Sequence, residues 1–171
     1  MYLAPMRKKQ VTVIGNYDAT PEQFELGVQV GELLASLDLI TITGGRTGLM
    51  EAVAKGAFEA GGMTVGILPS EDMNDGNNFN TVTIPSGIGY ARNSMNVLAA
   101  DAVIAIGGAA GTLSEMAFAW SYRRPIISFV GGGGWADALA GKQLDHRHEE
   151  PVDAAHDLEE LKAHLVRILE L

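Results

Sequence analysis

The chain has 171 residues, enough for one compact domain that buries a core of its own. Hydrophobic residues make up 47% and charged residues 19%, so the composition excludes a disordered chain and a coiled coil. Twelve basic side chains against 21 acidic ones give a formal net charge of -9, which argues against a nucleic-acid or anionic-membrane partner.

Short apolar runs and helix-period segments alternate along the first half of the chain. The β-branched run at 10–15 predicts a strand that ends at a glycine. Thr20, Pro21 and Gln23 then supply a cap, a proline and a capping-box partner for a helix that continues to about Ser36. The same reasoning predicts strands at 39–43, 64–68 and 81–84, a helix at 48–60 that ends at two glycines, and a polar loop at 69–80.

The second half continues the alternation. Residues 102–106 are apolar at every position, as expected of a central strand buried on both faces. The last segment, 157–171, is amphipathic and opens with a capping box from Asp157 to Glu160. The other expected elements are helices at 90–100, 112–122 and around 135–140, a strand at 125–130 and a polar, charged connector at 142–155.

This order of elements over residues 1–171 predicts a single α/β domain. We expect a Rossmann-like three-layer sandwich, with a mainly parallel sheet and helices on both of its faces. Ligands of such sheets collect at the carboxyl ends of the strands. A functional site is therefore expected along that edge.

Two of the expected strand-to-helix junctions share the pattern GGxxG. A loop without Cβ atoms lets backbone N–H groups converge, and the next helix adds unpaired N–H groups and a positive dipole end, which together favour phosphate. Tight turns before helices need glycine in any case, so a purely structural role stays open. The candidate ligand-binding residues are Gly44, Gly45, Arg46, Thr47 and Gly48 in the first loop, and Gly107, Gly108, Gly111 and Thr112 at the second.

Neither loop has one of the common nucleotide motifs. A P-loop needs a lysine where Thr112 follows Gly111, and no dinucleotide fingerprint follows the first strand, where Gly15 precedes Asn16 and Tyr17. Nucleoside triphosphate hydrolysis and nicotinamide chemistry are therefore disfavoured, and no cofactor is expected.

Charged and polar side chains near these loops are candidates for the chemistry. Arg92, at the expected start of a helix, could hold a phosphate or carboxylate with two N–H groups, or form an ordinary surface ion pair. Glu115 could stabilise a cationic transition state or orient a water, or could complete a capping box with Thr112. Arg46 is a third candidate anion ligand, and Asn93 follows Arg92 directly.

Three segments together carry a family resemblance: TGGRTGLM at 43–50, YARNSMN at 90–96 and GGAAGTLSE at 107–115. In order and spacing they resemble the LONELY GUY (LOG) proteins, long mislabelled lysine decarboxylases. The resemblance implies a Rossmann-like fold, a homodimer or homotetramer, and a bound nucleoside 5′-monophosphate. Catalytic members release free base and ribose 5-phosphate from it. By resemblance, Gly107, Gly108, Gly111 and Thr112 match the phosphate loop, and Arg92 and Glu115 match the catalytic pair.

Two departures point to a sister branch of that superfamily. Asn93 stands where the hormone-activating members have a lysine, and Ile106 replaces the proline before the second glycine pair. These features look more like the branch that includes the molybdenum-cofactor carrier proteins, in which the same edge is thought to hold a phosphorylated pterin. Decarboxylation is rejected because a pyridoxal enzyme needs a Schiff-base lysine, and no lysine lies in a glycine loop.

Two functions therefore stay open. In the first, a nucleoside monophosphate binds with its phosphate at 107–112 and loses its base to attack by water. Arg92 holds the phosphate or the leaving side, and Glu115 stabilises the developing ribosyl cation. In the second, the protein is a non-catalytic carrier or sensor of a phosphorylated pterin such as the molybdenum cofactor. A structural subunit with a vestigial site is the third possibility.

Other features narrow the class of protein. The absence of cysteine excludes disulfide bonds, cysteine-ligated zinc and thiol catalysis. No apolar run approaches the roughly 18 residues of a membrane span, so we expect a cytoplasmic protein. The histidine-containing stretch 146–150 is interpreted as a charged connector, and no metal site is expected.

Overall fold

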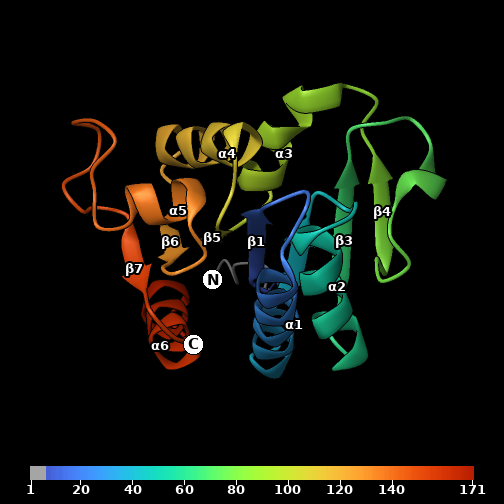
Figure 1. Ribbon diagram of the computed structural model, residues 1–171, viewed down its shortest axis with the longest axis horizontal. Coiled ribbons are helices and arrows are strands. Elements are labelled where there is room, and N and C mark those ends of the chain that lie inside the picture. Colours follow the sequence, from blue (N-terminus) through green and yellow to red (C-terminus); the bar gives the residue numbers. More distant parts are fainter. Residues whose placement is uncertain (1–6) are drawn as a thin grey trace, which may run out of the picture.

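The computed structural model describes residues 7–171, which form a seven-stranded sheet between two layers of helices (Figure 1). The strand order is β4-β3-β2-β1-β5-β6-β7, and every pairing is parallel. The strands are β1 Gln10–Gly15, β2 Ile40–Thr43, β3 Thr64–Leu68, β4 Val82–Pro85, β5 Ala102–Ile106, β6 Ile126–Phe129 and β7 Asp153–Ala155. The α/β sandwich expected from the sequence is confirmed.

Six α-helices and two short 3-10 helices, η1 and η2, connect these strands in the described part of the chain. Helices α1, α2 and α6 pack against one face of the sheet, and α3, α4 and α5 against the other. Their bounds are α1 Pro21–Ser36, α2 Leu49–Glu59, η1 Met73–Asp75, η2 Gly89–Arg92, α3 Asn93–Leu98, α4 Ala110–Ser121, α5 Gly134–Leu139 and α6 Leu158–Leu169. None of these helices is both long and apolar enough to cross a membrane.

The central strands show why the apolar run at 102–106 is continuous. In β5, Ile104 and Ile106 face the core under α1, α2 and α6, whereas Val103 and Ala105 face the core under α3, α4 and α5. All five residues of the strand are buried, because a parallel strand covered on both faces has no solvent-facing side.

Helix caps follow the sequence signals in part. At α1, the Thr20 side chain accepts from the Gln23 amide and the Gln23 side chain accepts from the Thr20 amide, so the expected capping box is present. At α6, Asp157 accepts from the Glu160 amide as expected. The Glu160 carboxylate, however, accepts from the His156 amide instead of the Asp157 amide. The second hydrogen bond expected of that capping box is therefore not formed.

Three expected elements differ from the structure. Helix α4 begins at Ala110, two residues before the expected start, because Ala109 occupies the N-cap position. The expected helix at 90–100 is divided into η2 and α3. The polar stretch 142–155 ends in β7, whose short pairing with β6 forms one edge of the sheet.

Candidate functional site

A cavity of about 660 Å³ opens at the carboxyl edge of the sheet, where the strand order reverses around β1. Loops that leave β1, β2 and β5 diverge at this point, and crevices of this kind are the usual ligand sites of open α/β sheets. Of the residues singled out from the sequence, those that line the cavity are Gly44, Arg46, Arg92, Asn93, Gly111, Thr112 and Glu115. Gly45, Thr47, Gly48, Gly107 and Gly108 lie beside it without lining it.

The first glycine loop, after β2, contributes mostly to the fold. The Gly45 amide donates to the Thr43 hydroxyl at 3.0 Å, and its carbonyl accepts from the Asn77 amide at 2.8 Å. Gly48 has a φ of 68° and lies against the Tyr17 carbonyl, where a Cβ would overlap backbone atoms. Thr47 is exposed and outside the cavity. The structural role left open for this loop therefore accounts for Gly45 and Gly48, two of its five residues.

The second glycine loop, after β5, is also largely occupied by contacts within the protein. The Gly108 amide donates to the Asn16 side-chain oxygen. The carbonyls of Gly107 and Gly108 accept from the amides of Ala136 and Trp135 at the start of α5. These two glycines therefore join the loops after β1, β5 and β6, and the Gly108 N–H is already hydrogen-bonded.

The first turn of α4 is the part of this segment that remains available. No side chain caps the helix at Ala109, and the amides of Ala110, Gly111 and Thr112 have no partner among the described residues. Gly111 and Thr112 line the cavity. An uncapped helix start beside a cavity presents N–H donors and a positive dipole end to any anion there.

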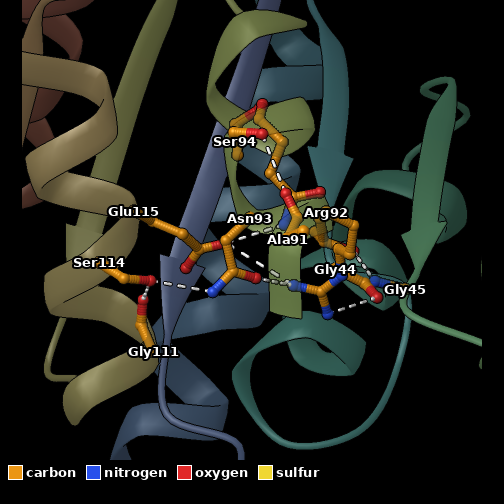
Figure 2. A network of polar contacts seen from close by, with 12 residues as sticks. Gly44, Gly45, Ala91, Arg92, Asn93, Ser94, Gly111, Ser114 and Glu115 are labelled. Atoms are coloured by element: carbon orange, nitrogen blue, oxygen red, sulfur yellow. Dashed lines mark hydrogen bonds and ion pairs between the residues drawn. The ribbon is translucent and has the colours of Figure 1, made fainter. Parts of the chain in front are cut away.

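Arg92 reaches the cavity from the end of η2 and is only 9% exposed (Figure 2). One of its terminal nitrogens donates to the Asn93 side-chain oxygen, and the other donates to the Gly44 carbonyl at 3.4 Å. Gly44 leaves the space for this guanidinium, since a Cβ there would lie 2.7 Å from Arg92 Nη2. The Arg92 Nε is buried and has no hydrogen-bond partner within residues 7–171.

Glu115 projects from the second turn of α4 toward Arg92 and is 7% exposed. Its Oε1 lies 3.9 Å from Arg92 Nη1 and accepts from the Asn96 side-chain amide at 2.8 Å. Burial raises the pKa of Glu115 to about 7, and the Asn96 hydrogen bond and the Arg92 charge only partly oppose it. The carboxyl group therefore exchanges a proton near neutral pH. The expected capping box between Thr112 and Glu115 is absent, and the carboxylate accepts from Asn96 instead.

Burial lowers the pKa of Arg92; the Glu115 carboxylate opposes this shift and the Arg46 charge adds to it. A guanidinium stays protonated at neutral pH even so. Because Glu115 is partly neutral while Arg92 and Arg46 stay charged, the cavity is locally positive within a protein of net charge -9.

Several contributors were not singled out from the sequence. Asn96, fully buried, positions Glu115, and its backbone carbonyl accepts from the Thr12 hydroxyl at 2.6 Å. Ser114 accepts from the Asn93 amide group at 3.0 Å and donates to the Gly111 carbonyl at 2.6 Å. Tyr17 and Tyr90 also line the cavity. The YARNSMN segment contained Asn96 and Tyr90, but nothing in its spacing indicated which side chains face inward.

The histidine-containing connector packs against the protein. His148 lies edge-on to the Trp120 ring, with centroids 4.5 Å apart, and Trp120 donates to Asp145 at 2.7 Å. Residues 7–171 contain no group of three or more histidine, aspartate or glutamate side chains placed to hold a metal ion.

Comparison with known proteins agrees with this architecture. The model of the SLOG cluster4 family matches residues 8–161, and the chain therefore belongs to this family. An uncharacterized protein of Archaeoglobus fulgidus is 42% identical over 124 residues, which cover 72% of this chain and 81% of that protein.

Two solved structures indicate the branch of the superfamily. The molybdenum cofactor binding protein of the phototrophic bacterium Rippkaea orientalis is similar with a TM-score of 0.84 and 34% identity, covering 97% of this chain and 99% of that one. The molybdenum cofactor carrier protein of Chlamydomonas reinhardtii has a TM-score of 0.80 and 28% identity, covering 96% and 100%. The resemblance to the LOG-like superfamily, nearest the carrier branch, is confirmed.

Proposed function

We propose that the protein binds a phosphorylated small molecule of the pterin type in the cavity at the carboxyl edge of the sheet, as a carrier or sensor. The observation that carries this proposal is the uncapped first turn of α4, which faces the same cavity as the buried Arg92. Helix N–H groups together with a guanidinium are a strong combination for a phosphate monoester.

The donors at the cavity support an anionic occupant. Arg92 lines the cavity, and each of its terminal nitrogens carries two N–H groups, of which the contacts to Asn93 and Gly44 use one apiece. A phosphate oxygen would accept from a terminal nitrogen of Arg92 while other oxygens accept from the amides of Gly111 and Thr112. The Asn93 side chain, fixed between Arg92 and Ser114, holds the guanidinium in place for this contact.

The pterin class is favoured over other phosphates by the relatives. Two structures similar over nearly the whole chain are of proteins described as a binding protein and a carrier of the molybdenum cofactor. The departures at Asn93 and Ile106 favour the same branch. The assembly expected with this function is a homodimer or homotetramer.

Purified protein can test the proposal directly. After gentle purification, oxidation followed by pterin fluorescence and mass spectrometry should detect a bound pterin phosphate, and loading the apoprotein should raise its melting temperature. Arg92→Ala should weaken phosphate-ligand binding by about tenfold or more, since hydrogen bonds to charged groups are worth roughly 1.5–3 kcal/mol. Lys162→Ala, an exposed charge change on α6, should leave binding unaltered. Absence of any bound or bindable pterin phosphate would exclude the carrier role.

A second candidate function is hydrolysis of a nucleoside 5′-monophosphate to free base and ribose 5-phosphate. The proximity of Glu115 and Arg92 in one cavity favours it, because a carboxylate can stabilise a ribosyl cation and activate water. Incubation with a panel of nucleoside monophosphates and chromatography of the free bases would test this activity. Base release no greater than that of a Glu115→Ala control would exclude it.

A further inference from the structure

The cavity has a polar inner part and an aromatic outer part. Arg92, Glu115 and Thr112, all at most 9% exposed, lie in the inner part. Tyr17 and Tyr90, which line the same cavity, are 61% and 88% exposed. A phosphate held by the inner groups leaves the exposed side chains of the two tyrosines without a partner. These side chains are available to a different part of the ligand.

Tyr17 is held in position although its ring is exposed. Its backbone carbonyl lies against Gly48, and the carbonyl of the preceding Asn16 accepts from the Leu49 amide at 2.9 Å. The Arg46 guanidinium carbon lies over the Tyr17 ring, 5.8 Å from its centre, within the range of a cation–π contact. The backbone of the loop after β1 is thus fixed at Tyr17, and Arg46 packs against the ring.

Tyr90 is presented from η2 on a separate segment. The Gly89 amide donates to the Pro69 carbonyl at 2.9 Å, and the Ala91 carbonyl accepts from the Ser94 hydroxyl at 2.9 Å, so this turn is fixed at both ends. Two residues later the same turn supplies Arg92. Tyr90 therefore reaches the cavity from the same short 3-10 helix that supplies the anion-binding guanidinium.

The size of the cavity also exceeds what a phosphate requires. About 660 Å³ is within the range of roughly 300–1,000 Å³ found for sites that enclose whole organic ligands. Exposed tyrosines at such a site supply large, rigid surfaces on which a planar ring stacks with little loss of entropy.

We propose that Tyr17 and Tyr90 form a stacking subsite for a planar heterocycle, and that they determine the preference for ring-bearing phosphates over sugar phosphates. This inference rests on the proposed function, because it assumes that the phosphate of the same ligand lies at α4 and Arg92. It identifies which side chains would recognise the ring, and Arg46 as the residue that braces Tyr17.

Calorimetric titration can separate the two parts of the ligand. The probes are guanosine 5′-monophosphate, whose base shares an aminopyrimidinone edge with pterins, together with ribose 5-phosphate, inorganic phosphate and guanosine. The wild-type protein should bind guanosine 5′-monophosphate about tenfold or more tightly than ribose 5-phosphate, as expected from stacking. In the double variant Tyr17→Leu, Tyr90→Leu, the tighter binding of guanosine 5′-monophosphate should disappear, while the affinity for ribose 5-phosphate should be unchanged. The matched Tyr17→Phe and Tyr90→Phe variants should keep the tighter binding.

The possible results distinguish the inference from the proposed function. Equal binding of the two phosphates, or an advantage that survives both leucine changes, overturns the stacking subsite and leaves the phosphate site standing. Tyrosine-dependent binding of guanosine with no binding of any phosphate supports the stacking subsite and overturns the phosphate site. Binding of none of the four probes overturns both.

Discussion

At the scale of single residues, the cavity contains a carboxyl group, that of Glu115, which the fold makes unusually hard to ionise. Glu115 is surrounded by protein on all but a small part of its surface, and one hydrogen bond from Asn96 with one charge at 3.9 Å does not offset its lost hydration. A group with a pKa of about 7 can accept or donate a proton to a ligand under physiological conditions. Both candidate functions can use that property.

The Glu115→Gln variant tests this electrostatic effect through stability. Because the folded-state pKa of Glu115 is raised above its unfolded value, the wild-type protein loses stability as the pH rises from about 4.5 to about 7. Glutamine has no such ionisation. The free energy of unfolding of the variant relative to wild type should therefore increase by up to about 3 kcal/mol between pH 4 and pH 8.

Urea denaturation at several pH values measures this difference. Asn96→Asp is expected to raise the Glu115 pKa further, because it replaces a donor with a second acidic group. A difference between Glu115→Gln and wild type that stays constant with pH would show that the carboxyl group titrates normally.

At the scale of elements, glycine has opposite consequences in two helices. Gly56 in α2 lies at the contact with α1, and a Cβ there would overlap the Val28 carbonyl. The two helix backbones approach so closely that no side chain fits. Gly111 in the first turn of α4 has no heavy atom within 4 Å of a Cβ placed on it.

Gly56→Ala should destabilise the protein although alanine favours helices. Moving the α1 and α2 backbones apart costs about 1–3 kcal/mol, more than the gain of about 1 kcal/mol in helix propensity. The midpoint of urea unfolding should fall. An unchanged midpoint would mean that the two helices separate without cost.

Gly111→Ala is the matched substitution without a helix contact. It should raise the free energy of unfolding by about 0.5–1 kcal/mol, because the new methyl group meets no protein atom. It should also weaken phosphate binding, since that methyl stands at the uncapped amides facing the cavity. Thermal unfolding and phosphate titration of the same sample check the two effects, and tighter phosphate binding would contradict the anion site at α4.

At the scale of the whole molecule, the central pairing of β1 with β5 joins the two halves of the chain. Asp101, just before β5, accepts from Arg7 through both carboxylate oxygens at 2.6 and 2.7 Å and from the Gln10 amide at 2.9 Å. Mainly through the Arg7 hydrogen bonds, the pKa of Asp101 is lowered to about 2. This cluster fixes the amino-terminal ends of the two central strands.

Asp101→Asn should therefore lower stability at pH 7. The folded-state pKa is depressed, so the contribution is present above the unfolded value of about 4 and is lost as the pH falls toward 2. The exposure of Arg7 reduces the expected effect to about 1 kcal/mol. Denaturation curves at pH 7 and pH 2.5 should show the full difference and a clearly smaller one, respectively. A deficit that is equally large at pH 2.5 would contradict the assignment to charge.

The parts of this fold that were predictable are those in which local pattern and burial agree. The apolar run at 102–106 indicates a strand buried on both faces, and the signal at Thr20 indicates a helix cap. The two glycine loops predicted a site at one edge of the sheet, and Arg92 and Glu115 lie at that edge. Strand β7 was not predictable, because its residues are polar or small and pair only after β6 is in place. The Asn16 contact to Gly108 and the inward direction of Asn96 depend on contacts between distant segments, which no local signal encodes.

The cavity takes its walls from both halves of the chain, with Tyr17, Gly44 and Arg46 on one side and Arg92, Thr112 and Glu115 on the other. An occupant that contacts both sides would act as a cross-link between them. Partial opening of either half would then require its release, so the occupant would protect amides in both halves from hydrogen exchange to a similar degree.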